Sequence, residues 1–580
     1  MSRLDKYDAI IIGGGHNGLT AAAYLSKAGK KVLVLERRHV LGGAAVTEEI
    51  FPGFKFSVCS YVVSLLKANV IRELMLPRFG LEILPLESTF TPLDNDYLFR
   101  TSDYDQTYKE IYRHSRKDAE NYTRFGPLMS QVGMAVRPIL ETIAPNAIRP
   151  SINDLVSLKN LLGHVKGLNN ETFEYLCKLM TMSSSDFLDE WFEFEPLKAT
   201  MSASGIIGTF MGPRSPGSAY VMLHHYMGDI DGSFRSWGFQ RGGTGELSMT
   251  IARSAQHFGA EILTETSVDK VIVKDGKAFG VALENGDEYK SDIVISGLDP
   301  KLTFLKMIDE NDLPADFVRD IRNFRIRGSS GKVNLALDGL PNFKSLPGDG
   351  PHLRGAISIS PSYDHLERAY DDAKYGNFSK EPYMDIILPS VLDPAMAPPG
   401  KHVMSCFVQY APYNINGGWD DIKREAFGDA VINTLSRFSP NIKDLILHRQ
   451  VLTPMDLEKT FGLTRNIILD ESKIILSRDE IGIWYFNNPT VISRGRNEFI
   501  SKWGERELED NWRLLSKISF SEQEEQEEQE STDNVLNEIA VKESDVDIVS
   551  AMKSLPFDDD EKILLNNCLL YTSPSPRDRG

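Results

Sequence analysis

Apolar, small and polar residues follow one another at the beginning of the chain in an order that predicts a strand, a helix and a second strand. The short apolar segment 9–12 predicts a buried strand. The small residues at 15–28 predict a helix that packs closely on a sheet, and the apolar segment 31–35 predicts a second strand. This strand ends at Glu36. Together these elements predict a βαβ unit with two parallel strands.

The turn between the first strand and the helix carries the pattern Gly13-x-Gly15-x-x-Gly18. Gly13 permits a sharp turn, Gly15 lets the backbone approach a pyrophosphate, and Gly18 lets the helix pack against the sheet. The N-terminus of the helix adds free N–H groups and partial positive charge for the phosphates. Glu36 lies 18 residues after Gly18, near the distance expected for a carboxylate that binds ribose hydroxyls. An ordinary βα turn can carry such glycines, but the complete order of elements favours a dinucleotide site.

The residues after Glu36 indicate which dinucleotide binds. Arg37 and Arg38 follow directly, and the glycine pair Gly42-Gly43 comes shortly after them. Proteins that bind FAD in an extended form commonly carry such a second glycine pair, which NAD dehydrogenases do not require. The carboxylate of Glu36 would repel the 2′-phosphate of NADP, and an arginine can pair with a phosphate. The alternative is a surface turn with two solvated arginines.

Further along the chain, the pattern predicts a second cofactor segment between two substrate-binding segments. The second cofactor segment is predicted to contain a helix at 247–258 and strands at 260–263, 268–273, 278–284 and 291–296, the last one buried. The substrate segments are predicted to contain helices at 108–114, 119–129, 155–168, 173–182 and 422–438 and strands at 332–337, 385–389 and 403–408. We therefore expect an α/β fold in which a Rossmann-like FAD-binding domain, a parallel sheet with a β-meander, is interleaved with an α+β substrate domain.

The expected domain boundaries follow from this order. The FAD-binding domain is expected at 1–90 and 231–305, and the substrate domain at 91–230 and 306–464. A divergent, largely disordered acidic tail is expected at 465–580, because Ser521–Asn534 is acidic and of low complexity.

Composition excludes several classes of function. The net charge of −18 comes mostly from residues 505–562, which hold 19 Asp or Glu and 6 Lys or Arg, and no basic patch supports nucleic-acid binding. No apolar run approaches the length of a membrane span, and no signal-peptide core or full transit peptide precedes the first strand. The four cysteines (Cys59, Cys177, Cys406 and Cys568) form no C-x-x-C motif and no metal-ligand spacing, which argues against a redox dithiol and a metal site.

Residues 7–61 resemble the carotenoid/retinoid oxidoreductase family, whose members include phytoene desaturases. Two segments carry the resemblance: YDAIIIGGGHNGLTAAAYL and ERRHVLGGAAVTEEIFPGFKFSVCSY. The resemblance implies FAD, a two-domain flavoprotein fold and a role in regulating mitochondrial function with a protein partner. It also implies a mitochondrial matrix location, to which the cytoplasm is the alternative. It also places Val268 where the backbone meets the adenine. The expected cofactor-binding residues are Ile12, Gly13, Gly14, Gly15, His16, Asn17, Gly18, Glu36, Arg37, Arg38, Gly42, Gly43, Ala44 and Val268.

The expected chemistry is oxidation of a small, apolar substrate by hydride transfer to flavin. Such a step needs no protein acid or base, so no catalytic residue is assigned; His224, His225 and Lys332 are candidates. The methionines at 182, 201, 211, 222 and 227 favour core packing over a substrate channel.

The chain departs from the family from about Arg465, where a glycine-rich flavin-binding segment is missing. This leaves three readings open: an oxidoreductase, a non-redox flavin isomerase, or a non-catalytic mitochondrial regulator that keeps the fold.

Overall fold

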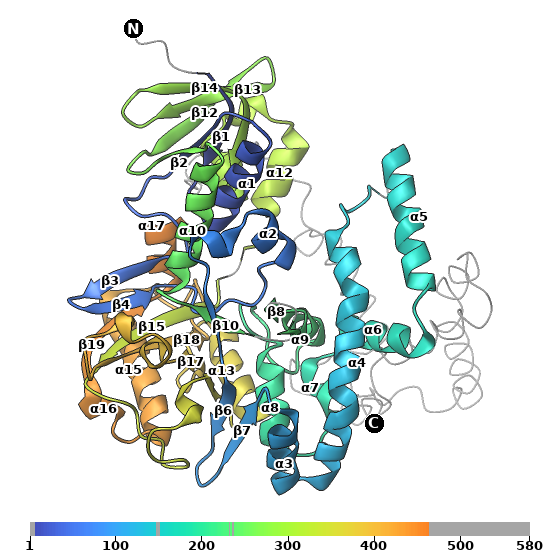
Figure 1. The fold of residues 1–580 in the computed structure, drawn as a ribbon, viewed down its shortest axis with the longest axis vertical. Helices are drawn as coiled ribbons and strands as arrows, with labels where there is room; N and C mark the ends of the chain where they lie inside the picture. Colours follow the sequence, from blue (N-terminus) through green and yellow to red (C-terminus); the bar gives the residue numbers. More distant parts are fainter. Residues whose placement is uncertain (1–5, 147–150, 231–232, 235–236, 327, 463–580) are drawn as a thin grey trace, which may run out of the picture. The chain divides into compact units, whose positions relative to one another are not determined.

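The predicted βαβ unit is present as β1 (Lys6–Ile12), α1 (His16–Lys27) and β2 (Val32–Leu35). The computed structural model describes residues 6–146, 151–230, 233–234, 237–326 and 328–462, all within one compact unit (Figure 1). The expected acidic tail at 465–580 lies outside the described residues.

β1 and β2 belong to a six-stranded sheet with the order β11-β2-β1-β14-β13-β12. The other members are β11 (Glu261–Leu263), β12 (Val268–Lys274), β13 (Lys277–Leu283) and β14 (Glu288–Ser296). β1 runs parallel to β2 and β14, whereas β12, β13 and β14 form the expected antiparallel meander. The prediction that the last strand is buried was wrong, because Ile293 in β14 is 55% exposed. One face of an antiparallel meander is commonly open to solvent.

Both faces of this sheet pack against apolar side chains. On one face α1 and α10 (Thr244–His257) contribute Leu19, Ala22 and Ala252 to a buried cluster with Val32 and Val34. On the other face, residues of β1 and β2 pack against the meander. Small residues in α1 allow the close helix–sheet contact that the sequence predicts.

A seven-stranded sheet forms the second part of the fold, with the order β19-β15-β18-β17-β16-β6-β7. Its strands are β6 (Ser88–Pro92), β7 (Tyr97–Thr101), β15 (Ser330–Leu337), β16 (Ala356–Ile359), β17 (Tyr383–Ile387), β18 (His402–Gln409) and β19 (Ile446–Leu452). Alternate residues of β15 face opposite sides, so that Val333 and Leu335 join an apolar core with α15 (Asp421–Phe438) while Lys332 faces the other side. The strand predicted at 385–389 ends earlier, because Pro389 begins the short helix α14 (Pro389–Leu392).

A group of helices lies beside this sheet (Figure 1). It contains α3 (Tyr104–His114), α4 (Arg116–Glu141), α5 (Ile152–Lys166), α6 (Asn170–Thr181), α7 (Ser184–Asp189), α8 (Glu195–Ala203) and α9 (Ser218–Tyr226). Met201, Met222 and Met227 are buried in the core of this group, with Tyr226 beside them. The expectation of core packing is confirmed for these three methionines and for Met182, which packs against the same core, but Met211 belongs to none of the apolar cores of the described residues.

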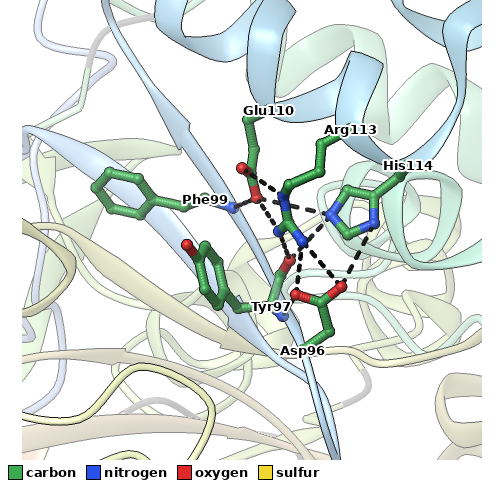
Figure 2. Close-up of polar contacts among 6 residues, drawn as sticks. All are labelled: Asp96, Tyr97, Phe99, Glu110, Arg113 and His114. Atoms are coloured by element: carbon green, nitrogen blue, oxygen red, sulfur yellow. Dashed lines mark hydrogen bonds and ion pairs between the residues drawn. The ribbon is translucent and has the colours of Figure 1, made fainter.

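A cluster of polar side chains joins α3 to the β6–β7 hairpin at the edge of the seven-stranded sheet. Arg113 of α3 pairs with Asp96 at 2.7 Å and with Glu110 at 2.8 Å, and its Nη2 donates to the carbonyl of Tyr97 (Figure 2). Its guanidinium also lies over the Tyr97 ring, 4.8 Å from the centroid. These contacts fix α3 against the hairpin that β6 and β7 form.

The remaining described elements connect these parts. They are β3 (Thr47–Phe51), β4 (Phe54–Ser57), α2 (Ala68–Glu73), β5 (Ile83–Pro85), β8 (Asp229–Ile230), β9 (Ser233–Phe234), β10 (Gly238–Gln240), α11 (Pro300–Leu305), α12 (Ala315–Asn323), α13 (Tyr363–Lys374), α16 (Ile442–Leu445) and α17 (Pro454–Phe461), with short 3₁₀ turns between them.

Candidate cofactor site

Residues from both parts of the fold line a cavity of about 920 Å³. All the predicted cofactor residues except Gly14 and Gly18 line it. His16 and Asn17, at the start of α1, are exposed and face this space. The cavity lies at the carboxyl ends of the parallel strands, where open α/β sheets bind ligands.

The glycine loop is held by backbone and carboxylate hydrogen bonds. The Gly14 N–H donates to Glu36 Oε2 at 2.8 Å, and the Arg38 N–H donates to Glu36 Oε1 at 2.9 Å. The Gly42 N–H donates to the Gly14 carbonyl at 2.9 Å and brings the second glycine pair against the first loop. Glu36 is only 7% exposed, so its carboxylate both organises the loop and borders the cavity.

Two glycines are required by close contacts. A Cβ on Gly18 would lie 2.3 Å from the Gly13 carbonyl oxygen, and a Cβ on Gly42 would lie 2.2 Å from the Ala45 carbonyl oxygen. Gly42 also has a φ of +126°, which residues with a side chain rarely adopt. By contrast, a Cβ on Gly15 would meet no atom closer than Gly43 Cα, at 4.0 Å. The space in front of Gly15 therefore belongs to the cavity.

Arg38 is held so that one of its nitrogens is left for a ligand. Its Nη2 lies 3.0 Å from both carboxylate oxygens of Glu48, and its guanidinium lies over the Phe461 ring at 5.0 Å. Its Nη1 is buried and has no hydrogen-bond partner among the described residues. Arg37 donates to the carbonyl of Thr460 at 3.0 Å. The end of α17 thus positions both arginines beside the cavity.

Several lining residues were missed in the sequence. They are Thr266, Ser267, Asp269 and Glu284 around the meander, Gly297, Leu298 and Asp299 after β14, and Tyr413, Leu457, Phe461 and Gly462 from the other part of the fold. The loop after β14 could have been found, because β14 is parallel to β1 and its carboxyl end must meet the same edge of the sheet. No local signal marked Tyr413 or α17.

Of the catalytic candidates, neither the histidine pair nor Lys332 lines the cavity. His225 stacks on Trp237, with centroids 5.8 Å apart, and burial lowers its pKa. This environment suits a packed neutral imidazole.

Lys332 and Asp385 are two buried polar residues on the same face of the second sheet, on either side of Phe407. Lys332 is opposite Phe407 of β18, which is opposite Asp385 of β17, so the three side chains share one face. Tyr61 stacks on Phe407, lies 4.4 Å below the Lys332 ammonium and donates to Asp385 at 2.6 Å. Burial lowers the pKa of Lys332 to about 8 and raises the pKa of Asp385 to about 6. The Lys332 Nζ has no hydrogen-bond partner within the described part of the chain.

The residues of the cavity fit FAD. No described side chain caps the N-terminus of α1, so its N–H groups stay free for a pyrophosphate. The buried Nη1 of Arg38 supplies a cation, and Glu36 supplies a carboxylate beside the cavity. These donors and acceptors match the phosphates and the ribose of a dinucleotide.

A comparison with protein families identifies the family of the chain and, with it, the cofactor. Residues 18–456 match the model described as flavin-containing amine oxidoreductase. The chain belongs to the flavin-containing amine oxidoreductase family. This family consists of FAD-dependent oxidoreductases, and the match confirms FAD as the cofactor and the expected α/β flavoprotein fold.

Curated relatives of this family cover most of the chain. The rat pyridine nucleotide-disulfide oxidoreductase domain-containing protein 2 is 40% identical over 79% of this chain and 83% of its own length. A component of the limonene dehydrogenase of Castellaniella defragrans is 26% identical over 79% of this chain and 83% of its own length. Prolycopene isomerase 1 of an Oncidium hybrid cultivar is 26% identical over 78% of this chain and 73% of its own length. The predicted resemblance to carotenoid-related flavoproteins is confirmed. Cys59 and Cys406 are free thiols.

Proposed function

We propose that this chain is an FAD-dependent oxidoreductase that dehydrogenates a small, apolar, unsaturated substrate. The observation that carries the proposal is the cavity, in which the dinucleotide-binding loop, Glu36 and Arg38 meet residues from the edge of the second sheet. FAD, when bound there, supplies a two-electron acceptor for hydride. The substrate would lose a hydride from one carbon to the flavin and a proton from the neighbouring carbon to solvent, and the C–H electron pair left behind would form the new C=C double bond.

The non-polar character of the substrate is supported by two relatives. Limonene and prolycopene, named in the two more distant relatives, are both unsaturated hydrocarbons. An apolar ligand is held mainly by burial, with few polar groups to orient it.

A non-redox flavin isomerase is the second candidate. Prolycopene isomerase, with similar coverage and identity to the limonene dehydrogenase component, favours it. Isomerisation moves a double bond or changes its geometry and leaves the mass of the substrate unchanged. Dehydrogenation lowers the mass by two hydrogens and requires an acceptor for two electrons.

Product analysis tests the proposal. The purified chain, with its FAD content measured after acid release, is incubated with limonene and with a cis-carotene, with and without an artificial electron acceptor. We expect a product that lacks two hydrogens and forms only with the acceptor, and bleaching of the flavin absorbance without oxygen. A product of unchanged mass that forms without acceptor would establish the isomerase. Retained FAD that no substrate or metabolite reduces would favour the non-catalytic role.

We also propose that the chain acts in the mitochondrial matrix, with a protein partner, and contributes to the regulation of mitochondrial function. The support is the sequence resemblance alone. Fractionation of cells, with protease protection of intact mitochondria, tests it. Recovery of the protein outside mitochondria would overturn it.

A further inference from the structure

The outer face of α5 carries apolar side chains that nothing in the described structure covers. Ile152 is 80% exposed, Leu155 54%, Val156 53% and Leu162 44%. Met134 and Leu140 on α4 and Ile143 just beyond its end are also exposed. Scattered exposed apolar residues are normal, but a contiguous apolar patch marks an interaction site. We call Ile152, Leu155, Val156, Lys159, Leu162 and Lys166 the α5 face.

The α5 face is one side of a well-formed helix. Residues 152, 155, 156, 159, 162 and 166 recur at helical spacing and share one side. Ser151 and Asp154 form a capping box that starts the helix. The inner side carries half-buried residues such as Leu158 and Leu161, and His164 contacts the carbonyl of Ala135 in α4 at 2.7 Å. Figure 1 shows α5 standing apart from the other helices, and none of its side chains is buried.

The charges on α5 indicate what kind of surface fits it. Lys159 and Lys166 are exposed on the apolar face. Asp154 is the only acidic residue of α5, and its carboxylate accepts hydrogen bonds from Ser151 and from the Asn146 N–H. The face is therefore apolar and positive, whereas the chain as a whole carries a charge of −18.

Two other occupants fit this face poorly. Between two copies related by a two-fold axis, Lys159 of one copy would approach Lys159 of the other with no acid on the face to pair with it. The acidic segment Ser521–Asn534 could pair with lysines, but it contains no apolar residue that would cover Leu155 and Val156.

We propose that the α5 face docks the protein on an anionic lipid surface. An amphipathic helix with apolar side chains and lysines on one side lies in the plane of the headgroups, with the apolar residues inserted and the lysines at the phosphates. Fifteen residues of helix are about 22 Å long, which is too short to cross a bilayer. No described helix is long and apolar enough to span a membrane. The proposal concerns docking alone and is independent of the substrate.

Flotation of the full chain with vesicles tests the proposal. Vesicles of phosphatidylcholine alone are compared with vesicles that also contain phosphatidylglycerol, without substrate. We expect the protein to float with the anionic vesicles and the variant Leu155→Glu/Val156→Glu to stay in the soluble fraction. Lys159→Gln/Lys166→Gln should lower binding to the anionic vesicles by about 25-fold, about fivefold for each lysine.

A matched control uses two exposed residues far from α5 in the sequence. Tyr375 is 76% exposed and Ile422 80% exposed, and Tyr375→Glu/Ile422→Glu adds the same two negative charges as the α5 variant. This control should float like the parent, and all variants should keep the parent's melting temperature, since every changed residue is exposed. Equal losses in both glutamate pairs, or no flotation of the parent, would overturn the proposal. So would a parent dimer that Leu155→Glu/Val156→Glu converts to a monomer, because the face would then join two copies.

Discussion

The replacement Gly15→Val should remove FAD from the protein while leaving the fold intact. Gly15 precedes α1 with φ of −72° and ψ of 165°, a conformation that valine readily adopts. A Cβ there has 4.0 Å to its nearest neighbour, Gly43 Cα. The only structural cost is a poorer helix cap, about 0.5–1 kcal/mol.

The loss of affinity follows from what the valine displaces. The side chain would fill the space in front of the free N–H groups of α1, where the pyrophosphate is expected. Hydrogen bonds to a charged group contribute about 1.5–3 kcal/mol each. Losing two of them weakens FAD binding by about 3–6 kcal/mol, or between about 10² and 10⁴-fold.

Gly18→Val is the matched comparison, three residues along the same helix. A Cβ at Gly18 would lie 2.3 Å from the Gly13 carbonyl oxygen and 3.2 Å from Ile11 Cγ2. This overlap forces α1 away from β1 and costs about 1–3 kcal/mol of folding stability. Gly15→Val therefore tests a contact with the cofactor, and Gly18→Val tests a packing contact within the protein.

Melting temperatures with and without added FAD, together with FAD released by acid, measure both effects. The parent should gain about 2.7 kcal/mol when free FAD is at 100 times its dissociation constant. Gly15→Val should melt near the FAD-free parent and gain no more than about 0.4 kcal/mol from the same FAD concentration, whereas Gly18→Val should melt lower even without FAD. Flavin content at the parent's level in Gly15→Val would refute the placement of the pyrophosphate.

Two further changes test groups that border the cavity or lie close to it. Glu36→Gln should weaken FAD binding by about 10- to 100-fold, because a neutral amide replaces the carboxylate that accepts hydrogen bonds from the Gly14 and Arg38 N–H groups. Titration calorimetry measures the change, and an unchanged affinity would contradict a role of Glu36 in binding FAD. The pKa of Lys332 is about 8 in the folded protein, so above that pH the unfolded chain binds more protons than the folded chain. The free energy of unfolding of the parent should therefore rise relative to that of Lys332→Met, by about 1.4 kcal/mol per pH unit up to about pH 9.5. Urea unfolding of both proteins across this pH range measures the difference. A difference that does not change with pH would show that Lys332 is not desolvated.

Local elements were predictable where their signals lie close together in the sequence. The strand, glycine loop, helix and acid at 9–36 interact within one βαβ unit, and the structure places them as predicted. The hairpin turns of the meander were also marked by local turn residues. The solvent exposure of Ile293 was not predictable, because an apolar run does not reveal which face of a sheet is covered.

The position of Lys332 and Asp385 on one face depended on the tertiary structure. The register of β15, β18 and β17 brings Lys332, Phe407 and Asp385 onto one face of the sheet. Tyr61, which is 324 residues from Asp385 in the sequence, donates a hydrogen bond to the carboxylate on that face. Strand register is a property of pairing between distant segments, and a shift of one residue would reverse the face. Burial is the largest cause of the pKa shifts of Lys332 and Asp385, and the interaction between the two charged groups opposes it.

The sequence by itself determined the nature of the cofactor, because the glycines, the strand ends and Glu36 that recognise a dinucleotide lie within one short segment. Only the tertiary structure decided how the site is closed. Arg37 donates to Thr460 across 423 residues of sequence, and Phe461 covers Arg38, whose Nη1 has no hydrogen-bond partner among the described residues. Contacts over such distances depend on how whole sheets and helices pack, and no local pattern encodes them.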